Sequence, residues 1–296
     1  MATNNIRPMP VDGRRFAINR CIAPGLAFTE FLKFARGAGV TKVELRNDLA
    51  ANHPIDGLDV GEAARLIEDY EIEVIAINAV QRFNLPSARR EALAEIDRLL
   101  DISAGIRCPS IVFCPNCEPA ESRSRTQRFD DTVEALNAYG PKFTAAGVLA
   151  YLEPLGYDYS SMPGLKEAVE AIRKTQFSCY RVLIDTFHHY VGPEGDDVFG
   201  DALAMTGLVH VSGVAGGDAR QPLGDAQRSL VDASDVIGTR EQLQSLLSLG
   251  YRGDISFEPY GYVGDASYQP RRGSPLRLGP AELQSALKRS MAYLAG

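Results

Sequence analysis

The sequence has few of the features that would assign it at once to a simple class. Its 296 residues include only five cysteines, an odd number at low density, so a disulfide framework is not expected. No uninterrupted apolar stretch approaches the roughly 20 residues that cross a bilayer. The opening segment, MATNNIRPMPVDGRRF, lacks the apolar core of a signal peptide. We therefore expect a cytoplasmic protein that does not associate with membranes.

Basic residues are not in excess. The 31 lysines and arginines stand against 38 acidic residues, which gives a formal net charge of −7. Because nucleic-acid binding depends on a basic face, this balance argues against a nucleic-acid partner. A GxGxxG segment after the first apolar run is absent too, which disfavours an open sheet that binds a dinucleotide.

What the sequence does contain is a regular alternation of short apolar runs and longer amphipathic segments. The apolar runs cover residues 16–22, 42–46, 73–78, 110–115, 149–153, 181–187, 208–213 and 254–260. Helical spacing follows each run, in residues 28–38, 61–70, 87–106, 127–146, 164–175, 196–205, 240–250 and 281–295. Continuous Val/Ile/Leu runs are typical of strands buried on both faces, and their alternation with helices implies parallel crossovers. Eight such units predict a single (β/α)8 TIM barrel over residues 1–296, with an open doubly wound sheet as the alternative.

Four residues that can bind a metal end four consecutive apolar runs in the second half of the chain. The segments LAYLEP, VLIDTFH, LVHVSG and ISFEP supply Glu153, Asp185, His210 and Glu258. The C-terminal ends of parallel barrel strands converge on one mouth, so these side chains are expected to meet. Three carboxylates and an imidazole around one point repel each other unless a cation lies among them. Taken singly, Asp185 could instead cap the following turn and His210 could be a hydrogen-bonded core imidazole.

Further polar residues end the first three runs at the same predicted rim. Glu44 and Arg46 end the second run, and Asn19 and Arg20 lie in the first. They either form an ion pair that closes the barrel mouth or recognise substrate hydroxyl groups. Asn78 ends the third run and is a candidate donor to a substrate hydroxyl.

Several segments together resemble the xylose-isomerase-like TIM-barrel superfamily of sugar isomerases and epimerases. The resemblance is strongest to its inosose (2-keto-myo-inositol) isomerase group. The segments are VELR at 43–46, AINA at 76–79, YLEPLG at 151–156, VLIDTFHHYVG at 182–192, LVHVSG at 208–213 and ISFEPYG at 255–261. They follow the family's order, and DTFH and LEPLG are the most specific of them.

The resemblance implies roles for individual residues. The four metal-type residues would bind one divalent cation, and Glu153 and Glu258 would also act as proton-transfer bases. His188 would touch a substrate oxygen, and Arg228 matches an arginine that contacts substrate in such enzymes. Related enzymes often carry an acidic pair after the metal-binding histidine, whereas this chain has VSG at 211–213. Mainly oxygen ligation with one imidazole suits Mn²⁺ or Mg²⁺, with Co²⁺ or Zn²⁺ as further candidates.

This set of residues predicts a divalent-metal-dependent isomerase or epimerase of sugars or keto-cyclitols. The cation would polarise the carbonyl of an α-hydroxyketone and acidify the adjacent C–H bond. Proton transfer between Glu153 and Glu258 would then pass through a metal-bound enediolate. Return of the proton to the same carbon is an epimerisation, and return to the neighbouring carbon is an isomerisation. A +2 ion with three carboxylates keeps one net negative charge, which favours a small neutral sugar or cyclitol as substrate.

Other functions remain open at this point. An inosose dehydratase-like lyase would share the metal site and would use His188 as the acid for a leaving hydroxyl. A phosphodiesterase similar to the abasic-site endonucleases of the superfamily would need histidines where this chain has Arg46, Asn78 and Pro115. A non-catalytic sugar-binding barrel is a fourth option.

Long connections at 213–238 and 261–279 are expected to cover the site. The Gly- and Tyr-rich stretch 260–268 either walls the pocket or forms a subunit contact in a homo-oligomer.

Overall fold

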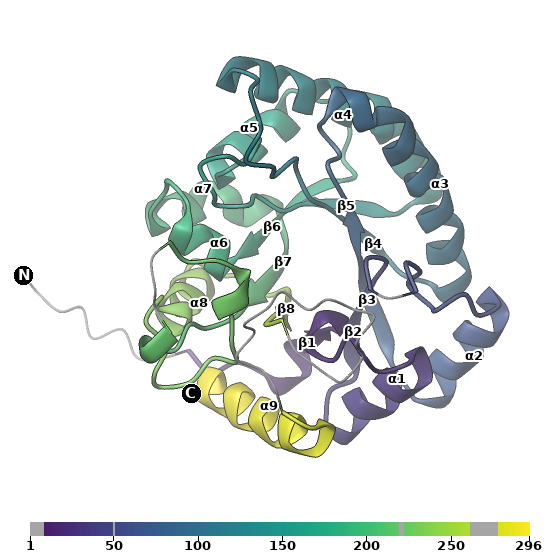
Figure 1. The fold of residues 1–296 in the computed structure, drawn as a ribbon, viewed down its shortest axis with the longest axis vertical. Coiled ribbons are helices and arrows are strands. Elements are labelled where there is room, and N and C mark those ends of the chain that lie inside the picture. The colour runs from purple at the N-terminus through teal and green to yellow at the C-terminus, as the bar shows by residue number, and fades with distance from the viewer. Residues whose placement is uncertain (1–8, 50, 219–221, 261–277) are drawn as a thin grey trace, which may run out of the picture.

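A closed barrel of eight parallel strands forms the centre of the protein (Figure 1). The structure is a computed structural model, and it describes residues 9–49, 51–218, 222–260 and 278–296. The strands are β1 (Phe16–Asn19), β2 (Lys42–Arg46), β3 (Glu73–Val80), β4 (Ser110–Phe113), β5 (Leu149–Leu152), β6 (Tyr180–Asp185), β7 (Thr206–Val211) and β8 (Asp254–Phe257). Strands β1 and β8 pair through Phe16 and Ile255 and so close the barrel. This confirms the predicted (β/α)8 architecture.

The helices form a ring outside the barrel (Figure 1). They are α1 (Phe28–Gly37), α2 (Val60–Asp69), α3 (Arg89–Ile106), α4 (Arg125–Ala146), α5 (Leu165–Arg173), α6 (Thr186–Val191), α7 (Phe199–Ala202), α8 (Thr239–Leu249) and α9 (Pro280–Ala295). Helix α9, near the C-terminus, packs beside α1 and completes the ring. None of the helices in the described part of the chain combines the length and apolarity needed to span a bilayer.

Local sequence signals explain where individual elements begin and end. Helix α4 begins with a capping box, in which the Ser124 hydroxyl accepts from the Gln127 backbone N–H and the Gln127 side chain accepts from Ser124 N–H. It ends at Ala146, and the Gly147 that follows has a φ of 68°, in the left-handed region that glycine adopts without strain. On the inner side of α4, Tyr139 and Phe143 pack edge-on against Phe113 of β4. Burial of such rings fixes each helix against its strand.

Most of the predicted runs continue past the end of the observed strand, and in two of them a capping side chain explains why. The first run was expected to extend to residue 22, but β1 ends at Asn19 and a 3₁₀ turn (Arg20–Ile22) follows. The Asn19 side chain starts this turn by accepting from Cys21 N–H at 3.0 Å. The sixth run was expected to extend to residue 187, but β6 ends at Asp185 and α6 begins at once. In both places a side chain at the strand end caps the next turn and so ends the strand.

The strand register brings the polar rim residues to one level. Asn19 of β1 pairs with Glu44 of β2. Asp185 of β6 pairs with His210 of β7. Because side chains on paired positions of a parallel barrel share one face, these residues reach the same end of the barrel interior. The site is therefore set by strand pairing rather than by loop conformation.

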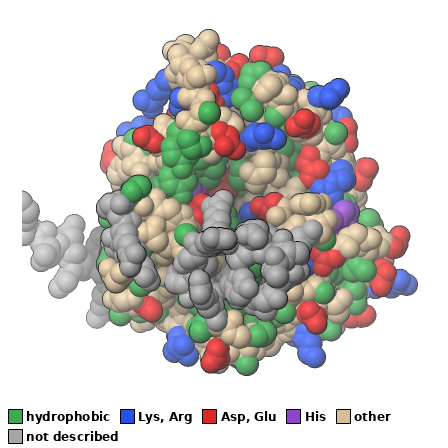
Figure 2. Space-filling model, in the orientation of Figure 1, with side chains coloured by type: hydrophobic (Ala, Val, Ile, Leu, Met, Phe, Trp, Pro, Cys, Tyr) green, Lys and Arg blue, Asp and Glu red, His purple; other side chains and the backbone are tan. Residues whose placement is uncertain are grey.

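The connections predicted to cover the mouth are only partly described. Residues 219–221 and 261–277 lie outside the described residues, as does the 260–268 stretch beyond Tyr260. Over the described surface in Figure 2, acidic and basic side chains are interspersed.

Candidate metal centre

The four residues predicted to bind a metal meet at the C-terminal end of the barrel. Glu153 directly follows β5, Asp185 ends β6, His210 lies in β7 and Glu258 directly follows β8. One donor atom from each of them lies within 4.8 Å of the donor atoms of the other three. This set is called the four-residue cluster below. It is the only such group found among the described residues.

The Nδ1 atom of His210 is the common neighbour of the three carboxylates. It lies 2.9 Å from Oε2 of Glu258, 3.0 Å from Oε1 of Glu153 and 3.8 Å from Oδ2 of Asp185. All four residues are at most 3% exposed. Carboxylate oxygens with one imidazole nitrogen form a donor set that suits Mn²⁺, Mg²⁺, Co²⁺ or Zn²⁺. The residues therefore fit a divalent cation, in number and in chemistry.

The pKa values within the cluster move in opposite directions. Burial raises the pKa of Glu153, and the neighbouring Glu258 carboxylate adds to the effect. Burial would also raise the pKa of Glu258, but the His210 and Arg228 cations outweigh it and hold that pKa well below its ordinary value. Burial would lower the pKa of His210, yet the surrounding carboxylates, first Glu258 and then Glu44, raise it well above its usual range. The two glutamates thus have distinct electrostatic environments.

Arg228 lies directly against the cluster. Its Nη2 atom is 2.6 Å from Oδ2 of Asp185 and 3.1 Å from Oε2 of Glu258. Its Nε donates to the Ser212 hydroxyl at 2.9 Å, and its guanidinium stacks over the Phe187 ring at 5.1 Å. Ser212 directly follows β7, so the end of that strand holds the Arg228 guanidinium through a neutral hydroxyl.

Arg46 also reaches the cluster, but through a different partner from the one that the sequence suggested. It does not pair with Glu44. Its Nη1 is 2.9 Å from Oε1 of Glu258, and its Nε and Nη2 form a two-point contact with Asp48. Asn78 donates to the same Oε1 of Glu258 at 3.3 Å. The proposed Glu44–Arg46 ion pair is therefore wrong, because Asp48 is within reach of the guanidinium just past the strand end.

Asp185 serves the helix and the cluster with separate oxygens. Oδ1 caps α6 by accepting from the backbone N–H groups of Phe187 and His188, at 2.7 and 3.1 Å. Oδ2 faces His210. The capping role and the cluster role considered from the sequence are thus compatible. Because the cap holds the backbone N–H of His188, it also fixes the backbone position from which the His188 side chain extends.

His188 is buried, and its Nδ1 atom has no hydrogen-bond partner. Its ring packs edge-on against Tyr157 and Phe187. The backbone beneath it is tightly packed, because a Cβ at Gly156 would lie 1.9 Å from the His188 carbonyl oxygen. The glycine of the LEPLG segment is thus needed for the close approach of the β5 loop to α6.

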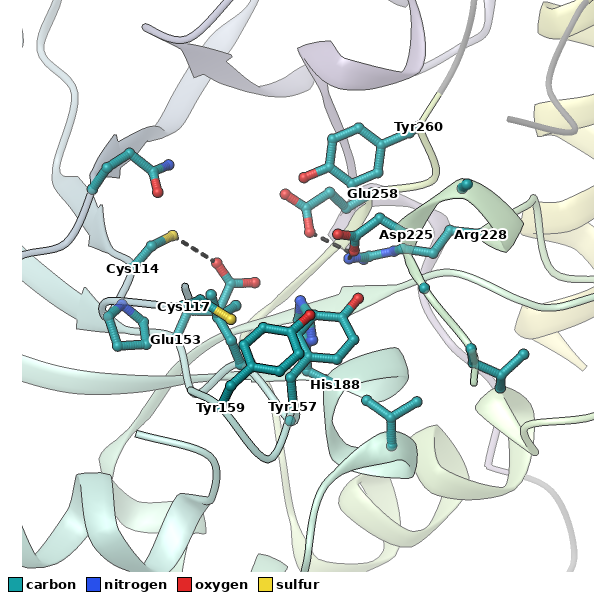
Figure 3. Close-up of a pocket in the computed structure, with 18 of the residues that line it drawn as sticks. Cys114, Cys117, Glu153, Tyr157, Tyr159, His188, Asp225, Arg228, Glu258 and Tyr260 are labelled. Atoms are coloured by element: carbon teal, nitrogen blue, oxygen red, sulfur yellow. Dashed lines mark hydrogen bonds and ion pairs between the residues drawn. The ribbon is translucent and has the colours of Figure 1, made fainter. Parts of the chain in front are cut away.

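A cavity of about 1080 Å³ opens above the cluster. Glu153, Glu258, His188 and Arg228 line it, and Figure 3 shows the carboxylates of the two glutamates close together. Arg46 and Asn78 also line this space, so all the predicted substrate-binding residues border one cavity. Asp185 and His210 do not line it. The two glutamates are therefore the cluster members that a bound molecule can touch.

The sequence placed Glu44 at the rim but did not reveal its contact with Nε2 of His210, at 2.9 Å. Cys114, which contacts Oε2 of Glu153 at 3.5 Å (Figure 3), was not among the predicted site residues. Tyr157 and Tyr159 stack on each other at the cavity wall, with centroids 5.3 Å apart. Position at a strand end was the available signal for Glu44 and Cys114. The tyrosines carry no such signal, since they lie in the loop after β5.

The fold agrees with what comparisons with known proteins find. Residues 32–285 match the family model of the xylose isomerase-like TIM barrel. The chain belongs to this family. A comparison with curated proteins gives no match.

Three solved structures illustrate the likeness. A xylose isomerase domain-containing protein from Salmonella typhimurium LT2 is 31% identical, with a TM-score of 0.84 over 97% of this chain and 100% of that one. The IolI protein, solved with a bound zinc atom, is 15% identical, with a TM-score of 0.80 over 95% and 98% of the two chains. D-psicose 3-epimerase from Clostridium cellulolyticum H10, solved with D-tagatose, is 15% identical, with a TM-score of 0.73 over 94% and 97%. The last two likenesses concern the fold alone.

Proposed function

We propose that this protein is a divalent-metal-dependent isomerase or epimerase that acts on a neutral keto-sugar or keto-cyclitol, as an inosose isomerase does. One observation carries the proposal. Two buried glutamates, Glu153 and Glu258, line one cavity and share a metal-type cluster with His210 and Asp185. Paired carboxylates beside a cation are the groups that proton transfer next to a carbonyl requires.

The four-residue cluster would hold the cation, which when bound supplies polarisation of the substrate carbonyl and so acidifies the adjacent C–H bond. Glu153 takes a proton from that carbon. Glu258 lines the same cavity and serves the second proton transfer.

The rest of the cavity supports a neutral, hydroxyl-rich substrate. Arg46 and Arg228 line it, but both already contact carboxylates of the site. Their positive charge is therefore largely balanced, so it offers an anion little attraction. The planar guanidinium groups and the Asn78 amide still offer N–H donors to sugar hydroxyls. His188 adds an imidazole with an unpartnered nitrogen.

Proton exchange with solvent tests the proposal directly. The purified protein, loaded with Mn²⁺, is incubated in deuterated water with inososes and ketohexoses, and products are read by NMR and mass spectrometry. We expect deuterium at a carbon next to the carbonyl of at least one substrate. Glu153→Gln and Glu258→Gln should each slow the exchange by about 10²–10⁴-fold, the usual contribution of a general base.

Two controls make the result decisive. Metal content is measured in each variant, because both glutamates also belong to the cluster. Glu121→Gln removes a buried carboxylate that pairs with Arg123 away from the cluster, and it should exchange at the wild-type rate. If protein loaded with Mn²⁺, Mg²⁺, Co²⁺ or Zn²⁺ incorporates no deuterium into any of these substrates, the proposal is wrong.

A lyase of the inosose dehydratase type is the second candidate, and the unpartnered Nδ1 of His188 is the observation that favours it. Dehydration needs a proton donor for the leaving hydroxyl. However, burial lowers the pKa of His188, so the imidazole is neutral at pH 7 and a weak acid. Isomerisation is therefore the better supported reaction. An ultraviolet-absorbing enone or diketone product would reverse that order.

A further inference from the structure

Glu44 is a charged residue that the proposed proton transfers do not use. Its side chain is fully buried in β2. Among the described residues, no lysine or arginine forms an ion pair with it; its ion-pair partner is His210, with Nε2 at 2.9 Å from Oε2 of Glu44. The same oxygen accepts from Asn19 Nδ2 at 3.3 Å, and Oε1 has no partner. Burial of a carboxylate costs desolvation free energy, which only strong interactions with its partners offset.

The contact keeps one proton of His210 on Nε2, the nitrogen that faces away from the other three residues of the cluster. A carboxylate can only accept a hydrogen bond, so Nε2 of His210 must donate to Glu44. Nδ1 is the atom that faces Glu153, Glu258 and Asp185. A cation bound there would take the place of the proton on Nδ1 and leave the one on Nε2. The ring is thus held in the orientation that a metal ligand needs.

We propose that Glu44 is a positioning residue that fixes His210 for metal binding and raises the affinity of the site for its cation. This inference rests on the proposed function, since it assumes a divalent cation in the four-residue cluster. Carboxylates that accept from the outer N–H of a metal-binding histidine orient the ring and increase its basicity. Glu44 has the required geometry and no other ion-pair partner in the described part of the chain.

Asn19 extends this arrangement to the opposite side of the cluster. Its Nδ2 donates to Oε2 of Glu44 and also to Oε1 of Glu258, at 3.3 and 3.1 Å. Its own Oδ1 is held by Cys21 N–H at 3.0 Å. One amide thereby links the residue that positions the histidine to a carboxylate of the cluster. Glu44 is consequently fixed by the register of β1 and β2, where it pairs with Asn19.

The test is metal affinity rather than turnover. Glu44→Gln keeps the shape of the side chain and removes its charge, and calorimetry compares its Mn²⁺ dissociation constant with that of the wild type. We expect affinity to fall by about 10–100-fold, the usual cost of losing an outer partner of a metal ligand. The absorption spectrum of the Co²⁺-loaded variant should also change, because a reoriented imidazole alters the ligand field. Glu44→Asp retains the charge, so its affinity should lie between the two.

Glu121→Gln is the matched control, since it neutralises a buried glutamate that contacts Arg123 instead of the cluster. It should lower the melting temperature and leave Mn²⁺ affinity and the Co²⁺ spectrum unchanged. If Glu44→Gln binds Mn²⁺ as tightly as the wild type, the positioning role is wrong and the proposed function stands. If the wild type itself binds no divalent cation, the proposed function fails. Should Glu44→Gln not fold, equal affinity of folded Glu44→Asp and wild type would overturn the inference.

Discussion

The prediction that follows most directly from the structure concerns thermal stability with and without a divalent cation. The perturbation is addition of Mn²⁺ to protein stripped with a chelator, compared between the wild type and Asp185→Asn. The stripped wild type should remain folded, because Arg46 and Arg228 contact the carboxylates of the cluster. A cation that binds only the folded state then adds stability through mass action.

The size of the effect can be worked out. At a free Mn²⁺ concentration of 100 times the dissociation constant, binding adds about 2.7 kcal/mol. Unfolding entropy is about 2.1 cal/mol/K per residue, which for a chain of 296 residues is about 0.6 kcal/mol/K. The melting temperature of the wild type should therefore rise by about 4 °C.

Asp185→Asn separates the two functions of this residue. The amide oxygen can still cap α6, because asparagine is as good a helix cap as aspartate. The carboxylate that faces His210 is lost, and metal affinity should fall at least about 100-fold, since even outer partners of ligands cost about 10–100-fold. At the same Mn²⁺ concentration the stabilisation is then only about 0.4 kcal/mol, or less than about 1 °C.

Differential scanning calorimetry over a metal titration measures both values. Asp185→Ala serves as a control that loses the cap as well, so its metal-free stability should fall by a further 0.5–2 kcal/mol or so. The reasoning is refuted if Mn²⁺, Mg²⁺, Co²⁺ and Zn²⁺ all leave the wild-type melting temperature unchanged. An equal rise in the wild type and Asp185→Asn would assign the cation to another part of the molecule.

Three further predictions concern separate parts of the structure. Glu153→Gln should reduce kcat by about 10²–10⁴-fold in a steady-state assay of whichever substrate exchanges deuterium, because a general base is lost. Glu121→Gln should cost about 1.5–3 kcal/mol at pH 7 in urea unfolding, since the charged contact with Arg123 holds the pKa of Glu121 at about 2. That lowered pKa stabilises the fold above pH 4.5 and is lost as the pH falls towards 2, so the difference from wild type should shrink over that range; a constant difference would contradict it. Ser124→Ala should cost about 0.5–2 kcal/mol through loss of the α4 cap, and an unchanged urea midpoint would refute the capping role.

The barrel was predictable because its signal repeats along the whole chain. Each apolar run became a strand, and strand order followed sequence order. The ends of strands and helices were less predictable where a polar side chain caps the next turn. The helix α6 was missed because Asp185 ends β6 and caps the next six residues, a length at which helical periodicity is weak.

The cluster itself was predictable because strand ends converge at one mouth of a barrel, whatever the loops do. The partners within the rim were not. Arg46 forms ion pairs with Asp48 and Glu258 instead of Glu44, and Glu44 contacts His210. Which of several acids an arginine contacts depends on barrel diameter and strand tilt, and these follow from the packing of the whole core. A pattern of residue types contains no such distances.

The cluster follows one rule that explains why the entire barrel is needed to build it. In each member, one polar atom faces the cluster and another is held by the scaffold. The Nε2 of His210 is held by Glu44 of β2, the Oε1 of Glu258 by Arg46 of β2, and the Oε2 of Glu153 by the Cys114 thiol after β4. The cluster comes from the ends of strands β5 to β8, whereas these three holding groups come from the first half of the chain. Asp185 is held instead by the backbone N–H groups of Phe187 and His188 in α6. A site whose side chains are fixed in this way loses little further freedom when it binds a cation, and its geometry is set before any ligand arrives. Closure of the barrel between β8 and β1 is therefore part of the site as well as of the fold.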